Sequence, residues 1–285
     1  MMTSTVTQGR ALTRDGIGLS YTHIAAGVGA PRAVFVHSLA LDRSLWDRVA
    51  GLLSGEFEML TYDCRGHGGS DAVAGPYSTA QFGGDLDDVL SAIGWDRAAV
   101  VGCSMGGCVA QQFAADHPDR TSAALFVDTT AWYGPQAPQH WADRANQAAT
   151  DGLASLLPFQ LTRWFGDAFR AAEPALLRRL SEIFLANRLD CYQATCAMLG
   201  AVDLRDRLAD IACPTAVLVG KDDQATPPAM AQALAEGLRT TPATVVPGTR
   251  HLTPLENPDV VAAALRDLLA STSAPATTIF QGSTA

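Results

Sequence analysis

The sequence lacks the features that would suit a membrane, a nucleic acid or a metal ion. No apolar run is long enough to span a bilayer, and the first residues lack the basic-then-apolar pattern of a secretory signal. A net charge of −9 disfavours general binding to nucleic acid or to an anionic membrane. No spacing of His, Cys or acidic residues matches a metal site, so neither a metal nor another cofactor is expected.

Cysteine is scarce, and its placement does not suggest a disulfide framework. The six cysteines are scattered at positions 64, 103, 108, 191, 196 and 213, and none forms a Cys-x-x-Cys pair. Reduced thiols in a cytoplasmic protein are therefore the expectation. The sequence also shows no internal repeat. Its 285 residues suffice for one large α/β domain with an insertion.

Short apolar runs that predict strands alternate with helical patterns, after an opening hairpin expected within 9–24. The other predicted strands cover 33–36, 59–62, 98–101, 124–127, 215–220 and 243–247. This alternation predicts an α/β fold with a mostly parallel, doubly wound sheet, that is, with helices on both faces.

One long segment breaks the alternation and divides the chain. Residues 132–205 are helical in pattern and predict an inserted helical cap, while 6–131 and 206–270 form the predicted core. A closing helix is expected at 258–270. Residues 271–285 are rich in Ser, Thr and Ala, which predicts a disordered tail.

The most informative motif is Gly102-Cys103-Ser104-Met105-Gly106, which lies between a predicted strand and a predicted helix. A Gly-x-Ser-x-Gly turn in this context is typical of a nucleophile elbow, where the serine stands exposed on a strained turn. Glycine at both flanks removes the Cβ atoms that would clash there. We therefore predict Ser104 as a nucleophile, with the side chain of Cys103 turned away from the pocket.

The partners of a catalytic triad follow in the order Ser, Asp, His. Asp223 follows the predicted strand 215–220, and His251 follows the next strand. The carboxyl ends of parallel strands meet at one edge of a sheet, so these side chains can converge. His251 would accept the serine proton, and the carboxylate would orient the imidazole.

Three aspartates compete for the role of the acid. Asp222 and Asp223 are neighbours on an extended segment, so only one should face His251, and we favour Asp223. Asp128 follows another strand, and its alternative role is to cap the loop that leads into the insertion.

The expected oxyanion hole consists of the backbone N–H groups of Leu39 and Met105. We expect His37 to support the loop that carries Leu39.

Several motifs together resemble the α/β-hydrolase superfamily and, more narrowly, the 3-oxoadipate enol-lactonases. They are His37-Ser38-Leu39-Ala40-Leu41-Asp42 with Trp46, Tyr62-Asp63-x-Arg65-Gly66-His67-Gly68-x-Ser70, Gly102-x-Ser104-Met105-Gly106-Gly107, Arg163-Trp164-Phe165 and Asp223-x-x-Thr226-Pro227-Pro228. The resemblance covers about residues 9–269 and implies the α/β-hydrolase fold. Two positions depart from the family pattern: Arg250 replaces the usual Gly before the catalytic His, and Cys103 replaces the usual Leu before the Ser.

The resemblance implies a hydrolase that cleaves a small carboxylic ester or lactone, of the enol-lactone type, through an acyl-serine intermediate. The alternatives are a carbon–carbon bond hydrolase of ring-cleavage products, a cofactor-free haloperoxidase or perhydrolase, and a non-catalytic ligand receptor on the same fold. The sequence leaves the oligomeric state open.

Four residues are candidates for substrate binding. Trp132 and Trp164 are aromatic residues of the predicted cap. Arg163 and Arg250 could each bind a substrate carboxylate. Arg163 could instead pair with an acidic residue of the cap, and Arg250 could instead be a solvated loop residue.

Overall fold

The computed structural model describes residues 5–273, and its centre is an eight-stranded sheet with the strand order β1-β2-β4-β3-β5-β6-β7-β8. The strands are β1 (Val6–Leu12), β2 (Gly18–Ile24), β3 (Arg32–Val36), β4 (Glu58–Tyr62), β5 (Ala98–Cys103), β6 (Thr121–Val127), β7 (Thr215–Gly220) and β8 (Thr244–Val246). The first hairpin is antiparallel, β2 pairs antiparallel with β4, and all later pairings are parallel. The predicted mostly parallel α/β sheet is confirmed.

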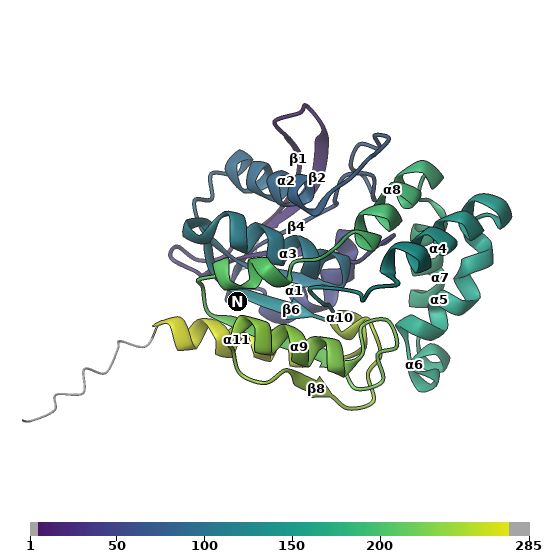
Figure 1. Ribbon diagram of the computed structural model, residues 1–285. Coiled ribbons are helices and arrows are strands. Elements are labelled where there is room, and N and C mark those ends of the chain that lie inside the picture. The colour runs from purple at the N-terminus through teal and green to yellow at the C-terminus, as the bar shows by residue number, and fades with distance from the viewer. Residues whose placement is uncertain (1–4, 274–285) are drawn as a thin grey trace, which may run out of the picture.

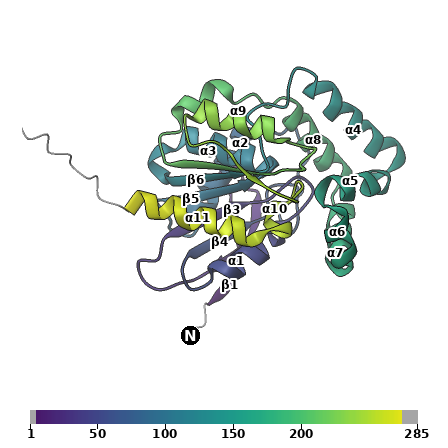
Figure 2. The same cartoon turned by 90° about the horizontal axis from the view of Figure 1, so that it is seen from below.

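Helices cover both faces of this sheet (Figures 1 and 2). The helices are α1 (Asp47–Leu53), α2 (Thr79–Ala92), α3 (Met105–Asp116), α4 (Ala137–Asp151), α5 (Leu157–Trp164), α6 (Asp167–Ala172), α7 (Pro174–Leu185), α8 (Leu189–Gly200), α9 (Pro228–Leu238), α10 (Thr253–Glu256) and α11 (Pro258–Ser273). Figure 2 shows α2, α3 and α9 on one face and α1 and α11 on the other. This arrangement is the α/β-hydrolase fold. No helix within residues 5–273 is long and apolar enough to cross a membrane.

The central strands are buried because helices cover both of their faces. Every residue of β5 is buried, as are the last four residues of β3 and the last five of β6. Such continuous apolar runs are typical of parallel strands in the middle of a doubly wound sheet. The carboxyl ends of β3, β5, β6, β7 and β8 therefore lie at one edge, and the loops that follow them meet there.

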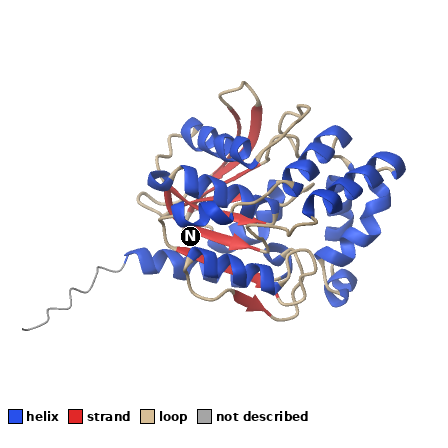
Figure 3. Cartoon of the chain, in the orientation of Figure 1, coloured by secondary structure: helices blue, strands red, loops and turns tan. Residues whose placement is uncertain are grey.

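Helices and connecting loops make up the insertion, residues 132–205, which lies between β6 and β7 in the chain (Figure 3). Its helices α4 and α8 pack against each other, and the whole insertion stands beside the sheet (Figure 1). The closing helix α11 extends to Ser273, so residues 271–273 of the expected tail are helical. The rest of that tail lies outside the described residues.

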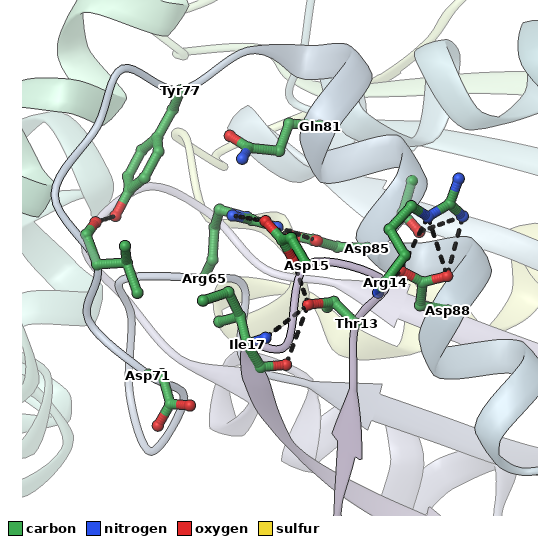
Figure 4. A network of polar contacts seen from close by, with 12 residues as sticks. Thr13, Arg14, Asp15, Ile17, Arg65, Asp71, Tyr77, Gln81, Asp85 and Asp88 are labelled. Atoms are coloured by element: carbon green, nitrogen blue, oxygen red, sulfur yellow. Dashed lines mark hydrogen bonds and ion pairs between the residues drawn. The ribbon is translucent and has the colours of Figure 1, made fainter.

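A buried ion pair ties the loop after β4 to α2. Arg65 Nε donates to Asp85 Oδ2 at 2.6 Å, and only 3% of either side chain is exposed. Arg65 Nη1 also donates to Asp15 Oδ2 in the β1–β2 hairpin at 3.0 Å, and Figure 4 shows the guanidinium between the two carboxylates. Arg65 thus joins the hairpin, the loop and the helix, whereas the nearby Arg14–Asp88 pair involves a mostly exposed arginine.

The burial of this pair predicts a large loss of stability when it is broken. Asp85→Asn leaves the buried guanidinium of Arg65 with only one carboxylate partner, the half-exposed Asp15. We therefore expect the free energy of unfolding to fall by roughly 3 kcal/mol. Asp88→Asn makes the same change in the same helix, but its partner Arg14 is mostly exposed and stays solvated when the pair is broken, so the change should cost less than about 1 kcal/mol. Urea titration of the three proteins measures both values. Equal losses would show that burial does not set the strength of the Arg65 network.

Candidate active site

Ser104 forms a sharp turn between β5 and α3, with φ 55° and ψ −117°. Its carbonyl accepts hydrogen bonds from Gly107 N–H at 2.8 Å and from Cys108 N–H at 3.2 Å. A Cβ on Gly102 would lie 2.1 Å from the carbonyl oxygen of Gly106. A left-handed φ is unfavourable for serine, so the close packing around the turn maintains it.

Three side chains from three loops form a continuous hydrogen-bonded chain. Ser104 Oγ lies 2.9 Å from His251 Nε2, and His251 Nδ1 lies 2.8 Å from Asp223 Oδ2. An ionised carboxylate can only accept, so Nδ1 carries the proton and the Nε2 lone pair faces Ser104. This arrangement makes the imidazole a base toward the serine hydroxyl.

Of the two neighbouring acids, Asp223 faces the histidine and Asp222 is exposed. Asp223 Oδ1 accepts from the N–H groups of Ala225 at 2.7 Å and Thr226 at 3.0 Å. Burial alone would raise the pKa of Asp223, but His251 and these donors outweigh it and hold the pKa below its usual value. The carboxylate is therefore ionised beside the imidazole.

Asp128 has neither of its two predicted roles. Its Oδ1 accepts from Gly220 N–H at 3.0 Å, and its Oδ2 accepts from Thr253 N–H at 2.8 Å. It therefore joins the end of β7 to α10 and does not cap the loop into the insertion. Burial, followed by the charge of Asp223, raises the pKa of Asp128 well above its usual value.

Two backbone N–H groups near Ser104 are unpaired within residues 5–273. Met105 is the first residue of α3, where an N–H has no intrahelical partner, and Leu39 lies in the turn after β3. The turn is closed by Leu41 N–H donating to Ser38 O at 3.2 Å, with Ala40 at φ 58°. The two predicted oxyanion donors are thus free to bind a ligand oxygen.

A buried histidine holds the turn that carries Leu39. His37 Nε2 accepts from Cys64 N–H at 2.9 Å, so its Nδ1 bears the proton that reaches Ser38 O at 2.8 Å. Burial lowers the pKa of His37 to about 4, which keeps the ring neutral and this tautomer fixed at neutral pH. From the insertion, Asn187 Nδ2 donates to Ala40 O at 2.9 Å.

The hydrogen-bonded chain opens into a cavity of about 350 Å³ between the core and the insertion. Ser38, Leu39, Ser104 and His251 line it from the core, and Tyr133 is among the residues that line it from the insertion. Cys103 is fully buried and does not line the cavity, as expected. A volume of this size fits a small organic ligand.

Two arginines of the insertion line this cavity without an acidic partner in the described part of the chain. Arg163 makes no hydrogen bond or ion pair there, and its guanidinium carbon lies 5.5 Å from the centre of the Phe159 ring. Arg144 donates to Tyr192 Oη at 2.6 Å and to Gln160 Oε1. Burial, followed by the charge of Arg144, lowers the pKa of Arg163. The cavity is therefore cationic although the protein is acidic.

The structure places the other predicted substrate-binding residues differently. Trp164 lines the cavity as predicted, and its ring also packs against the ring of Phe184, with 5.7 Å between the ring centres. Trp132 lies outside the cavity, where the Arg205 guanidinium covers its ring at 3.8 Å. Arg250 also lies outside, because its side chain turns toward main-chain carbonyls of the insertion.

Sequence analysis missed Arg144, although a signal was present. Ala137, Trp141, Arg144 and Ala148 follow a spacing of three or four residues and so share one face of α4. Ala137 and Ala148 are buried and Trp141 is half-buried, so this face points into the protein. A cation on the inward face of a helix is a sign of a binding role.

Comparisons with known proteins show the family of the chain. A sequence profile of the Alpha/beta hydrolase family matches residues 33–264. The chain is 29% identical to 3-oxoadipate enol-lactonase 2 of Acinetobacter baylyi over 247 residues, which cover 87% of this chain and 91% of that protein.

Solved structures show the same likeness. The enol-lactonase from Burkholderia xenovorans matches with a TM-score of 0.85 and 31% identity over 92% of this chain and 100% of that chain. A thermophilic esterase from Thermogutta terrifontis matches with a TM-score of 0.85 and 26% identity over 94% of this chain and 100% of that one. The resemblance predicted from the motifs is confirmed: the chain belongs to the alpha/beta hydrolase family.

Proposed function

We propose that this protein hydrolyses a carboxylic ester or lactone through an acyl-serine intermediate at Ser104. The observation that carries the proposal is the hydrogen-bonded chain from Ser104 through His251 to Asp223, which faces the cavity between the core and the insertion. Family membership and the enol-lactonase relatives support it further.

In the proposed reaction, Ser104 Oγ attacks the carbonyl carbon while its proton passes to His251 Nε2. Asp223 stabilises the imidazolium that forms. The unpaired N–H groups of Leu39 and Met105 would bind the developing oxyanion, which needs donors fixed before the reaction starts. The imidazolium then protonates the leaving oxygen, and a water activated by His251 releases the acid.

We propose that the substrate carries a carboxylate of its own. Arg144 and Arg163 face the cavity with no carboxylate partner in the described residues, and two such cations repel each other where little water screens them. A substrate carboxylate would relieve this repulsion and accept charge-assisted hydrogen bonds. An acidic lactone of the enol-lactone type therefore fits best, and its ring opening would leave the new acid and an enol, which becomes a ketone, on one molecule.

We further propose that residues 132–205 act as a cap. Tyr133, Arg144, Arg163 and Trp164 come from this segment and line the cavity over Ser104. The core, 6–131 and 206–270, would then supply the chemistry, and the cap would supply the contacts that select the substrate.

The proposal for the nucleophile predicts that Ser104→Ala loses on the order of a million-fold in turnover, because the triad acts as a unit. The mutant should also lose labelling by a fluorophosphonate probe, observed as a mass shift of the intact protein. Cys103→Ala is the matched control at the adjacent position, and it should still be labelled. A mass shift that persists in Ser104→Ala would rule out this serine.

The geometry around His251 predicts which acid is essential. Asp223→Asn replaces the proton acceptor of Nδ1 and favours the wrong tautomer, so we expect kcat to fall on the order of ten-thousand-fold. Asp222→Asn changes an exposed neighbour and should lose less than about ten-fold. Kinetics of Asp128→Asn complete the comparison, after its fold is verified by circular dichroism. A dominant loss at Asp128 in a folded protein would contradict the assignment.

The unpaired cations predict a preference for acidic substrates. The wild type should open a lactone with a free carboxylate faster, in kcat/KM, than the same lactone with a carboxamide. Removing Arg163 or Arg144 as Arg→Met should lower this acid preference about ten- to a hundred-fold, because each loses a charge-assisted bond. Arg179→Met, at an exposed arginine of α7, is the control. A wild type that prefers the neutral lactone would indicate a general esterase or lactonase instead.

A further inference from the structure

Residues on both sides of His251 hold one short stretch of the insertion. Glu256 Oε2 accepts from Arg250 N–H at 2.8 Å, and its Oε1 accepts from Gly166 N–H at 3.0 Å. The guanidinium of Arg250 donates to Thr162 O and, at 3.3 Å, to Phe165 O. We call these contacts, together with the bond from Leu252 N–H to Trp164 O at 3.3 Å, the clasp.

The stretch that the clasp holds is the last turn of α5 and the residues that follow it. Carbonyl groups at the end of a helix lack intrahelical partners and carry a partial negative charge. The guanidinium of Arg250 supplies hydrogen bonds and positive charge at this end from a distant segment of the chain. Arg163 and Trp164, which line the cavity, lie within the stretch.

Arg250 does not share the cavity that contains Ser104. It lines a separate hollow with Asp167 and Asn257. Its effect on a ligand beside Ser104 must therefore pass through the backbone of the insertion.

Arg163 depends on that backbone more than His251 does. Asp223 holds the His251 ring directly, at 2.8 Å. Arg163 has no hydrogen-bond partner in the described residues, so the last turn of α5 and the contact with Phe159 set the place of its guanidinium. Loosening the clasp should thus displace Arg163 while the triad keeps its geometry.

We infer that Arg250 is a positioning residue for substrate selection. Through the clasp it holds Arg163 at the place where a substrate carboxylate binds, and it fixes the position of Arg163 relative to His251. This inference rests on the proposed function, in which Arg163 binds that carboxylate. It also gives a role to the arginine that stands where enol-lactonases usually have glycine.

The first test compares Arg250→Met with the wild type on the acidic lactone and its carboxamide. Methionine keeps much of the length of the side chain and removes its donors. We expect KM for the acidic lactone to rise about ten-fold, with kcat and the carboxamide kinetics changed less than about two-fold. Arg250→Lys keeps one charged donor and should recover part of the loss. Arg179→Met, which breaks another ion pair between the insertion and the core, should change neither substrate.

The second test is a double-mutant cycle with Arg163→Met. If Arg250 acts through Arg163, adding Arg250→Met to Arg163→Met should change the acid preference no further, because the two effects share one interaction. Should Arg250→Met fail to fold, Glu256→Gln opens the same clasp by losing one of its two backbone bonds, and it should lower the acid preference in the same direction.

Two results would overturn the inference. One is an unchanged acid preference in a folded Arg250→Met or Glu256→Gln enzyme. The other is an effect of Arg250→Met that persists in full when Arg163 is already absent. Failure of the proposed function would give another result: Arg163→Met alone would leave the acid preference unchanged.

Discussion

The close approach of α3 to the centre of the sheet is the constraint on which the site depends. A Cβ on Gly106 would lie 2.1 Å from the carbonyl oxygen of Val36, so no side chain fits between the first turn of the helix and β3. The chain must therefore reverse within one residue, and Ser104 takes a strained backbone conformation. The same turn directs Oγ at His251 and leaves Met105 N–H free. The strain, the proposed nucleophile and the proposed oxyanion donor thus have one physical origin.

The cavity combines this rigid turn with two arginines of the insertion, Arg144 and Arg163, that have no acidic partner in the described residues. Burying Arg163 near Arg144 costs free energy, because burial and like charge both disfavour two cations. Such a cost is characteristic of a binding site, where the missing anion arrives with the ligand. We infer that the clasp between Arg250 and the end of α5 fixes the position of Arg163 relative to His251 of the core. In the proposed function, the core would provide the catalytic geometry and the insertion would select the substrate, and the two segments are joined next to His251.

The sequence predicted what depends on local pattern and strand order. Glycine spacing predicted the turn at Ser104, and the strand ends predicted where Asp223 and His251 would come from. It did not predict the partners of Arg250, because main-chain carbonyls of residues far away in the chain leave no mark in side-chain identity. Trp132 was misplaced for a related reason: an aromatic residue in the insertion can pack under Arg205 as readily as it can face a ligand. Arg144 did not stand out because it shares its face of α4 with Ala137 and Ala148, and such small side chains mark an inward face only weakly.

The central claim is that the reaction passes through an acyl intermediate on Ser104. Its most direct test is the mass of the enzyme trapped by rapid quenching during turnover of an acidic enol-lactone. A lactone keeps its leaving oxygen after ring opening, so the account predicts an adduct with the full mass of the substrate, located by peptide mapping on Ser104. An adduct on another residue would contradict the account. So would rapid turnover with no adduct at any time while a linear activated ester, under the same quench, shows one.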